Sequence, residues 1–293
     1  MASLRDIRRR IGSIRNIAQI TRAMEMVAAS RMKRAQEAIL AARPFSEELD
    51  DVLARVATTA VDAEEPLLER RPVRHVAMIV VTTDRGLAGA LNSNQIRTVL
   101  RWIADRATQV GDDAPRVSAV TVGRKGRDAV RRAGIPVAAH FGQFGDRPTF
   151  ADVQPLARLV TDDFRTGVYD EVVMAYSAFV STLVQRPTVA TLLPVEPPTL
   201  GGAEALRTDE YLFEPSADIL TRLLPFYVAN GIYRAVLENI ASEHSARMIA
   251  MRNATDNAHE LIDELTLVLN KTRQATITRE MIEIASGAEA QAR

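Results

Sequence analysis

The stretch ITRAMEMVAASRMKRAQEAI, residues 20–39, decides how the rest of the chain is organised. Its apolar residues recur at three- and four-residue spacing, which is typical of an amphipathic helix. The same rhythm extends from Leu4 to Ala42, and a second apolar stripe lies beside it: Ile17, Ile20, Met24 and Val27. This pattern predicts a coiled-coil seam that widens in its middle.

The helix is predicted to be very long. Pro44 lacks the amide donor that a helix interior needs, so a kink is expected there, but helical spacing resumes at once in FSEELDDVLARVA, residues 45–57. We therefore predict an N-terminal coiled-coil helix within residues 1–58. A second pattern with the same spacing predicts an even longer C-terminal helix within residues 216–287. Its predicted seam includes Ala254, Ala258, Leu261, Leu265, Val268, Thr272 and Ala275.

Between these helices the pattern changes to an alternation of strands and helices. Short runs rich in β-branched residues predict five strands, at residues 74–83, 116–122, 136–141, 170–179 and 186–195. Helical patterns separate them at 90–107, 124–133 and 151–166. Such alternation predicts a central α/β domain, residues 74–200, of Rossmann-like type with a mainly parallel sheet.

The expected dimensions indicate how these parts fit together. At 1.5 Å per residue, the two helices would be roughly 80 Å and roughly 100 Å long. A compact domain of about 140 residues is only about 35 to 40 Å across. We therefore expect residues 1–58 and 216–287 to bury their seams on each other as an antiparallel coiled coil. The alternative is that one or both helices break and fold back on the sheet.

Composition narrows the possible functions. The chain has 293 residues, 47% hydrophobic and 25% charged, which is typical of a soluble globular protein. It has no cysteine, so thiol chemistry and disulfides are excluded. No apolar run is long enough to span a membrane, and MASLRDIRRRIG lacks the apolar core of a signal peptide. We expect a cytosolic protein.

The zero net charge hides a basic N-terminal segment. Residues 1–43 carry many arginines, which raises the question of a nucleic-acid partner. The segment contains no aromatic residue, and its basic side chains are spread around the helix. A solvated or protein-facing surface is the favoured interpretation, without nucleic acid.

Two glycine-containing turns invite comparison with phosphate-binding loops. Gly86 and Gly89 follow the first predicted strand in TTDRGLAGALNSNQ, and VGRKG contains Gly123, Lys125 and Gly126 after the second. Neither turn completes a dinucleotide fingerprint or a P-loop. Structural strand-to-helix turns are the favoured interpretation, and no cofactor is predicted.

No catalytic or metal site can be assembled from the sequence. The four histidines are scattered, without the spacing that places two ligands on one helical face: His75, His140, His244 and His259. No Ser-His-Asp grouping is apparent. We therefore predict neither catalytic nor metal-binding residues.

Four stretches of the chain resemble the gamma subunit of the F-type ATP synthase, in order and over almost its whole length. They are LRDIRRRIGSIRNIAQITRAMEMVAASRM from residue 4, TTDRGLAGALNSN from residue 82, VQRPTVATLLP from residue 184, and a C-terminal stretch that ends in ITREMIEIASGAEA at residue 290. The resemblance implies a non-catalytic central rotary shaft that transmits torque between the membrane c-ring and the catalytic alpha/beta hexamer.

The resemblance also implies partners, a location and contact residues. It implies one copy per complex, bound to the alpha and beta subunits, the epsilon subunit and the c-ring, at the cytoplasmic face of a bacterial cell membrane and peripheral to it. The bacterial origin is suggested by the missing cysteine pair and regulatory insert. The implied coupling contacts are Met24, Arg273, Gln274, Thr278 and Glu283. The alternative function is an α/β nucleotide-binding regulator that oligomerises through a coiled coil.

Overall fold

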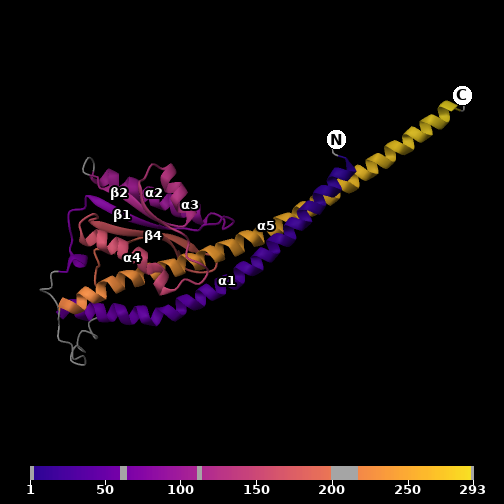
Figure 1. The fold of residues 1–293 in the computed structure, drawn as a ribbon. Coiled ribbons are helices and arrows are strands. Elements are labelled where there is room, and N and C mark those ends of the chain that lie inside the picture. Colours follow the sequence, from indigo (N-terminus) through magenta and orange to yellow (C-terminus); the bar gives the residue numbers. More distant parts are fainter. Residues whose placement is uncertain (1–2, 60–64, 111–113, 199–216, 292–293) are drawn as a thin grey trace. The chain divides into compact units, whose positions relative to one another are not determined.

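The computed structural model describes residues 3–59, 65–110, 114–198 and 217–291. The chain divides into two compact units, one of residues 29–247 and one of residues 1–28 with 248–293. Two long helices, α1 (Leu4–Thr59) and α5 (Ala217–Gln291), supply residues to both units (Figure 1). Each helix is a single uninterrupted element, so the alternative in which the helices break is wrong. None of the described helices is long and apolar enough to cross a membrane.

The 29–247 unit is built on a five-stranded sheet in the order β3-β2-β1-β4-β5. Its strands are β1 (His75–Val81), β2 (Arg116–Val122), β3 (Val137–Phe141), β4 (Glu171–Phe179) and β5 (Gln185–Leu193). The first four strands are parallel, and β5 runs antiparallel to β4. The predicted α/β fold with a mainly parallel sheet is confirmed.

Strand β1 is buried on both faces, which explains its unbroken apolar sequence. Because successive side chains of a strand point to opposite faces, Ala77 and Ile79 join one core cluster, whereas Val76 and Met78 join the other. Both faces of the sheet are therefore covered at β1.

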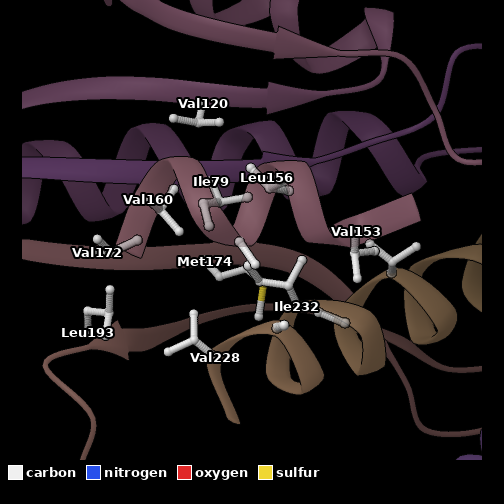
Figure 2. Packing of buried hydrophobic residues seen from close by; sticks show 14 of the residues in the cluster. Ile79, Val120, Val153, Leu156, Val160, Val172, Met174, Leu193, Val228 and Ile232 are labelled. Atoms are coloured by element: carbon white, nitrogen blue, oxygen red, sulfur yellow. The ribbon is translucent and has the colours of Figure 1, made fainter. Parts of the chain in front are cut away.

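The two layers of helices differ in origin. On one face, α2 (Leu91–Val110) and α3 (Arg124–Arg132) complete the smaller core cluster. On the other face, α4 (Phe150–Arg165) packs between the sheet and α5. Figure 2 shows Leu156 and Val160 of α4 beside Ile79 and Met174 of the sheet, with Ile232 of α5 close by.

Helix α1 continues through Pro44 despite the lost hydrogen bond. A proline in a helix interior costs about 3 kcal/mol, but burial of a leucine contributes about 1.5–3 kcal/mol. Leu49 and Leu53, in the turns that follow, are 6% and 0% exposed. Phe45 also contacts Phe226 of α5 edge to face, with ring centroids 5.6 Å apart. Packing of the C-terminal part of α1 therefore offsets the cost of the proline.

In the second unit, α1 and α5 run antiparallel. Thr21 is hydrogen-bonded to Thr255, and Glu25 is hydrogen-bonded to Arg252, so the numbers rise along one helix and fall along the other. The predicted seam is partly wrong on α5, because Leu261 and Val268 are 47% and 48% exposed. The positions that continue the spacing from buried Ala258 are half-buried instead: Ile262, Leu265, Leu269, Thr272 and Thr276.

Candidate functional site

Part of the exposed surface of α1 in the 1–28/248–293 unit is apolar. The stripe beside the seam is exposed, with Ile17 at 51%, Ile20 at 59% and Val27 at 53%. Met26 is 62% exposed, whereas Met24 is only half-buried, at the border between the stripe and the seam. Apolar side chains gathered on one exposed helix face are typical of a surface that contacts another protein.

The same unit contains a shallow groove of about 550 Å³, whose lining includes none of Ile17, Ile20 and Val27. Arg15, Gln19, Arg22 and His259 give its walls polar groups, and small or apolar side chains form the rest: Ala18, Ala23, Met26, Thr255 and Ile262. The groove is too open and too short of acidic groups to form an active site with general acid–base chemistry. Its mixture of cations and apolar groups suits contact with a protein surface.

The seam beside the stripe contains buried polar side chains that the apolar spacing did not predict. Thr21 and Thr255 are 9% and 3% exposed, and their hydroxyl oxygens lie 2.7 Å apart. Arg252 Nε donates to Glu25 Oε1 at 2.9 Å, and Glu25 is 7% exposed. The second oxygen of Glu25 accepts no hydrogen bond, and Arg22 lies 3.8 Å away. The missed signal was a glutamate at a seam position, one turn after Thr21.

The C-terminal candidates lie on a different part of α5. Arg273, Gln274 and Thr278 are exposed, and the Thr278 hydroxyl donates to the Gln274 carbonyl oxygen at 3.0 Å. Glu283 belongs to α5, but its side chain lies outside the described residues. At 1.5 Å per residue, Arg273 is about 30 Å along the helix from Arg252, the partner of Glu25. The structure therefore does not bring Met24 together with the C-terminal candidates.

The last turns of α5 have no described helix of this chain opposite them. Since α1 begins at Leu4 and runs antiparallel, its pairing with α5 ends near residue 272. Beyond that point large apolar side chains are exposed, including Ile277 at 48%, Met281 at 65% and Ile284 at 73%. Within the described residues nothing covers these side chains, so a partner protein is the expected cover.

The VGRKG turn of the 29–247 unit is occupied by the chain's own oxygens. The Arg124 amide donates to Asp84 Oδ1 at 2.8 Å, and the Gly126 amide donates to Thr82 Oγ1 at 2.8 Å. These are the amides that would hold a phosphate at a helix N-terminus. A Cβ on Gly126 would lie 2.7 Å from Thr82 Oγ1, so this glycine allows close packing of α3 on β1.

The carboxyl ends of β1 and β4, where open α/β sheets usually bind ligands, are also filled from within. Gln95 donates to the carbonyl oxygens of Val81 and Ala175, one on each strand. From α5, the Asn239 side chain accepts the Ser177 amide and the Ser242 hydroxyl donates to the Ser177 carbonyl. The favoured interpretation of the VGRKG turn as structural agrees with these hydrogen bonds.

A polar cluster, in which Glu243 and His244 are buried and Asp146 is exposed, ties α5 to the loops at this edge of the sheet. Asp146 lies 2.8 Å from Arg31 and 3.2 Å from His244. Arg247 pairs with Glu243 at 2.6 Å and donates to the Gly86 carbonyl at 3.2 Å. Burial lowers the pKa of the His244 imidazole, against the opposing effect of the Glu243 and Asp146 carboxylates. The charged groups of this cluster are therefore partnered by one another, and the cluster holds α5 against the loops.

Among the described residues, no group of three or more acidic, histidine or cysteine side chains could hold a metal ion. His140 bonds the Thr121 hydroxyl at 3.0 Å, and His259 lines the groove in the other unit. The scattered histidines of the sequence are therefore not gathered by the described part of the fold.

Comparison with known proteins identifies relatives over the whole length. The family model described as ATP synthase matches residues 3–291. The ATP synthase gamma chain of Dehalococcoides mccartyi (strain CBDB1) is 50% identical over 293 residues, covering 99% of both chains. That of Roseiflexus castenholzii is 51% identical over 293 residues, again covering 99% of both chains.

Solved structures show the same fold. The chain is similar to one in the central stalk and c-ring of the Tetrahymena thermophila mitochondrial ATP synthase, with 25% identity and a TM-score of 0.61, covering 80% of this chain and 99% of that one. It is also similar to a chain of the Euglena gracilis mitochondrial ATP synthase, with 20% identity and a TM-score of 0.65, covering 98% of this chain and 94% of that one.

Proposed function

Because the chain belongs to the ATP synthase gamma chain family, we propose that it is the central rotary shaft of a proton-translocating F-type ATP synthase. In this role it transmits torque between the membrane c-ring and the catalytic alpha/beta hexamer. One structural observation carries the proposal: the paired helices of the 1–28/248–293 unit expose apolar side chains along α1 and at the end of α5. A surface of this kind needs surrounding protein.

The proposed shaft is not itself catalytic. Support comes from the VGRKG turn, where Asp84 and Thr82 accept the Arg124 and Gly126 amides, and from the adjoining sheet edge, which Gln95 fills. ATP chemistry then belongs to the alpha/beta hexamer, and the conformation of this chain determines which catalytic site is in which state. The complex is an ATPase and synthase, whereas this subunit couples it to proton flow.

The proposed coupling contacts are Met24, Arg273, Gln274, Thr278 and Glu283. Exposure of Arg273, Gln274 and Thr278 supports their availability to a partner. Met24 is half-buried, so its contact would be made by one edge of its side chain. A polar contact contributes about 1 kcal/mol, or about 1.5–3 kcal/mol with a charged partner. Contacts of this size can favour one conformation of the hexamer without trapping the shaft at one of its three equivalent rotational positions.

The proposed assembly contains one copy of this chain with the alpha, beta and epsilon subunits and the c-ring. It lies at the cytoplasmic face of a bacterial cell membrane and is peripheral, held to the membrane through the complex. We also propose that residues 1–58 and 216–287 act as one mechanical element and residues 74–200 as a separate domain. The comparisons give no support to a nucleotide-binding regulator that oligomerises through a coiled coil.

Subunit stoichiometry tests the proposal. The complex is purified from native membranes through an affinity tag on this chain, and its subunits are quantified by mass spectrometry. We expect one copy of this chain for every three beta subunits. A self-contained homo-oligomer without alpha and beta subunits would refute the proposal and favour the regulator.

A further inference from the structure

The seam of the 1–28/248–293 unit buries the less apolar side of α1. Between residues 18 and 28 the buried positions are Ala18, Thr21, Glu25 and Ala28. The exposed stripe beside them, Ile17, Ile20 and Val27, is far more apolar. Since hydrophobic stabilisation scales with the apolar area removed from water, a roll of α1 about its own axis that brought this stripe into the seam would bury more apolar surface.

Two polar pairs oppose such a roll. The Thr21 and Thr255 hydroxyls lie 2.7 Å apart, and Arg252 Nε donates to Glu25 Oε1 at 2.9 Å. The pairs are one turn apart on each helix and occur at opposing positions, so both can form only when one particular side of α1 faces α5. A roll of α1 would break both pairs together.

Stability alone does not account for a glutamate in this seam. Replacing a buried ion pair by apolar residues of similar volume is often neutral or stabilising, and the best-attested role of such groups is to specify one register or orientation. Glu25 fits that role, because its side chain is 9% exposed and its Oε2 atom accepts no hydrogen bond. Its partner Arg252 keeps most of its side chain in water, at 62% exposed.

We propose that the Thr21–Thr255 and Glu25–Arg252 pairs form a rotational lock that holds the apolar stripe of α1 on the outside, where partner subunits contact it. Glu25 and Arg252 are then positioning residues, which act through the stripe and need not touch the hexamer themselves. The assignment of the stripe to partner contact rests on the proposed function, whereas the lock itself concerns this chain alone.

Cysteine labelling of the full-length chain tests the lock directly. The chain has no cysteine, so Ile20→Cys and Ala18→Cys each provide a single thiol, one exposed and one buried in the seam. Arg252→Met removes the cation and keeps an apolar stem. In that background we expect maleimide labelling to slow by about ten-fold or more at position 20 and to accelerate at position 18, because thiol reactivity follows exposure.

Three further variants sharpen the labelling test. Arg252→Lys retains a cation and is expected to restore the parent labelling rates. Arg279→Met removes an exposed arginine of α5 and is the matched control, with no change expected. Thr21→Val combined with Arg252→Met removes both pairs, and circular dichroism checks that helix content is retained. Unchanged labelling at both positions in this double variant would overturn the lock.

Proton pumping by the assembled complex then separates the lock from the proposed function. In membranes where the variant is the only gamma chain, Arg252→Met should lower ATP-driven proton pumping relative to ATP hydrolysis, and Arg252→Lys should restore it. Altered labelling with normal pumping would contradict the role of the stripe in coupling. An unmodified chain that supports no coupled pumping in its own complex would instead refute the proposed function.

Discussion

At the scale of single residues, Met24 stands at the border between two environments. It follows the exposed stripe of α1 and immediately precedes Glu25, whose side chain is buried in the seam. A flexible thioether tolerates both packing and sliding contact. Small chemical changes here should therefore alter coupling more than folding.

Met24→Lys is predicted to leave assembly and part of the ATP hydrolysis intact while impairing ATP-driven proton pumping several-fold. The added charge would attract acidic groups of a partner subunit, so that one rotational position of the shaft would be held too strongly. Inverted membrane vesicles report both activities in one preparation. Met24→Leu, which conserves volume, is the control, and equal pumping per ATP in both variants would count against a coupling role for Met24.

At the scale of secondary-structure elements, the approach of α3 to β1 shows why a turn can look like a phosphate loop and serve packing. Gly123 has φ +86°, and a Cβ there would lie 2.3 Å from the Thr82 carbonyl oxygen. A Cβ on Gly126 would lie 2.7 Å from the Thr82 hydroxyl oxygen, and the Gly126 amide donates to that oxygen. The glycines are required because a strand and a helix meet at this turn without room for side chains.

Gly126→Ala is predicted to destabilise the chain by about 1–3 kcal/mol, as is usual for overpacking. The added methyl group would lie 2.7 Å from Thr82 Oγ1 and 2.9 Å from its Cγ2 atom. Chemical denaturation of the full-length chain measures the change. Gly86→Ala is the matched control, because a Cβ there meets no atom within 4 Å. Equal stability of the two variants would show that α3 does not press on β1.

The elements were largely predictable from the sequence, and the exceptions have physical causes. Periodicity located the strands within about two residues and showed that both long helices exist. It could not give the direction of β5, because a parallel and an antiparallel edge strand share the same alternation. It also placed Leu261 and Val268 in the seam. Apolar residues at helical spacing are assigned to a buried face from the sequence alone, whether or not a partner helix packs against them.

The candidate site was less predictable than the fold. Exposure of Arg273, Gln274 and Thr278 cannot be read from spacing, and their role as contacts stays a prediction that came from family resemblance. Glu25 and Arg252 were missed because each is ordinary when taken alone. Only the antiparallel pairing of α1 with α5 brings their side chains to 2.9 Å.

At the scale of the whole molecule, two features occur together. The binding edge of the sheet is filled, and the long helices leave a stripe on α1 and apolar side chains at the end of α5 exposed. A conventional α/β enzyme has the opposite arrangement, with an open sheet edge and covered helices. Here Gln95 and α5 close the edge of the sheet, while Ile20 and Met281 remain 59% and 65% exposed. Helices with such surfaces are suited to turning against surrounding subunits, because many weak contacts can be broken and remade more easily than one strong contact.

Observation of rotation tests this central claim most directly. Arg131→Cys gives the otherwise cysteine-free chain one exposed thiol on α3, to which a bead or gold particle is attached. The hexamer is fixed to glass through its beta subunits, and ATP is added. The proposed shaft predicts unidirectional, stepwise rotation of the particle that depends on ATP. A particle that stays still while the same complexes hydrolyse ATP would contradict the rotary function.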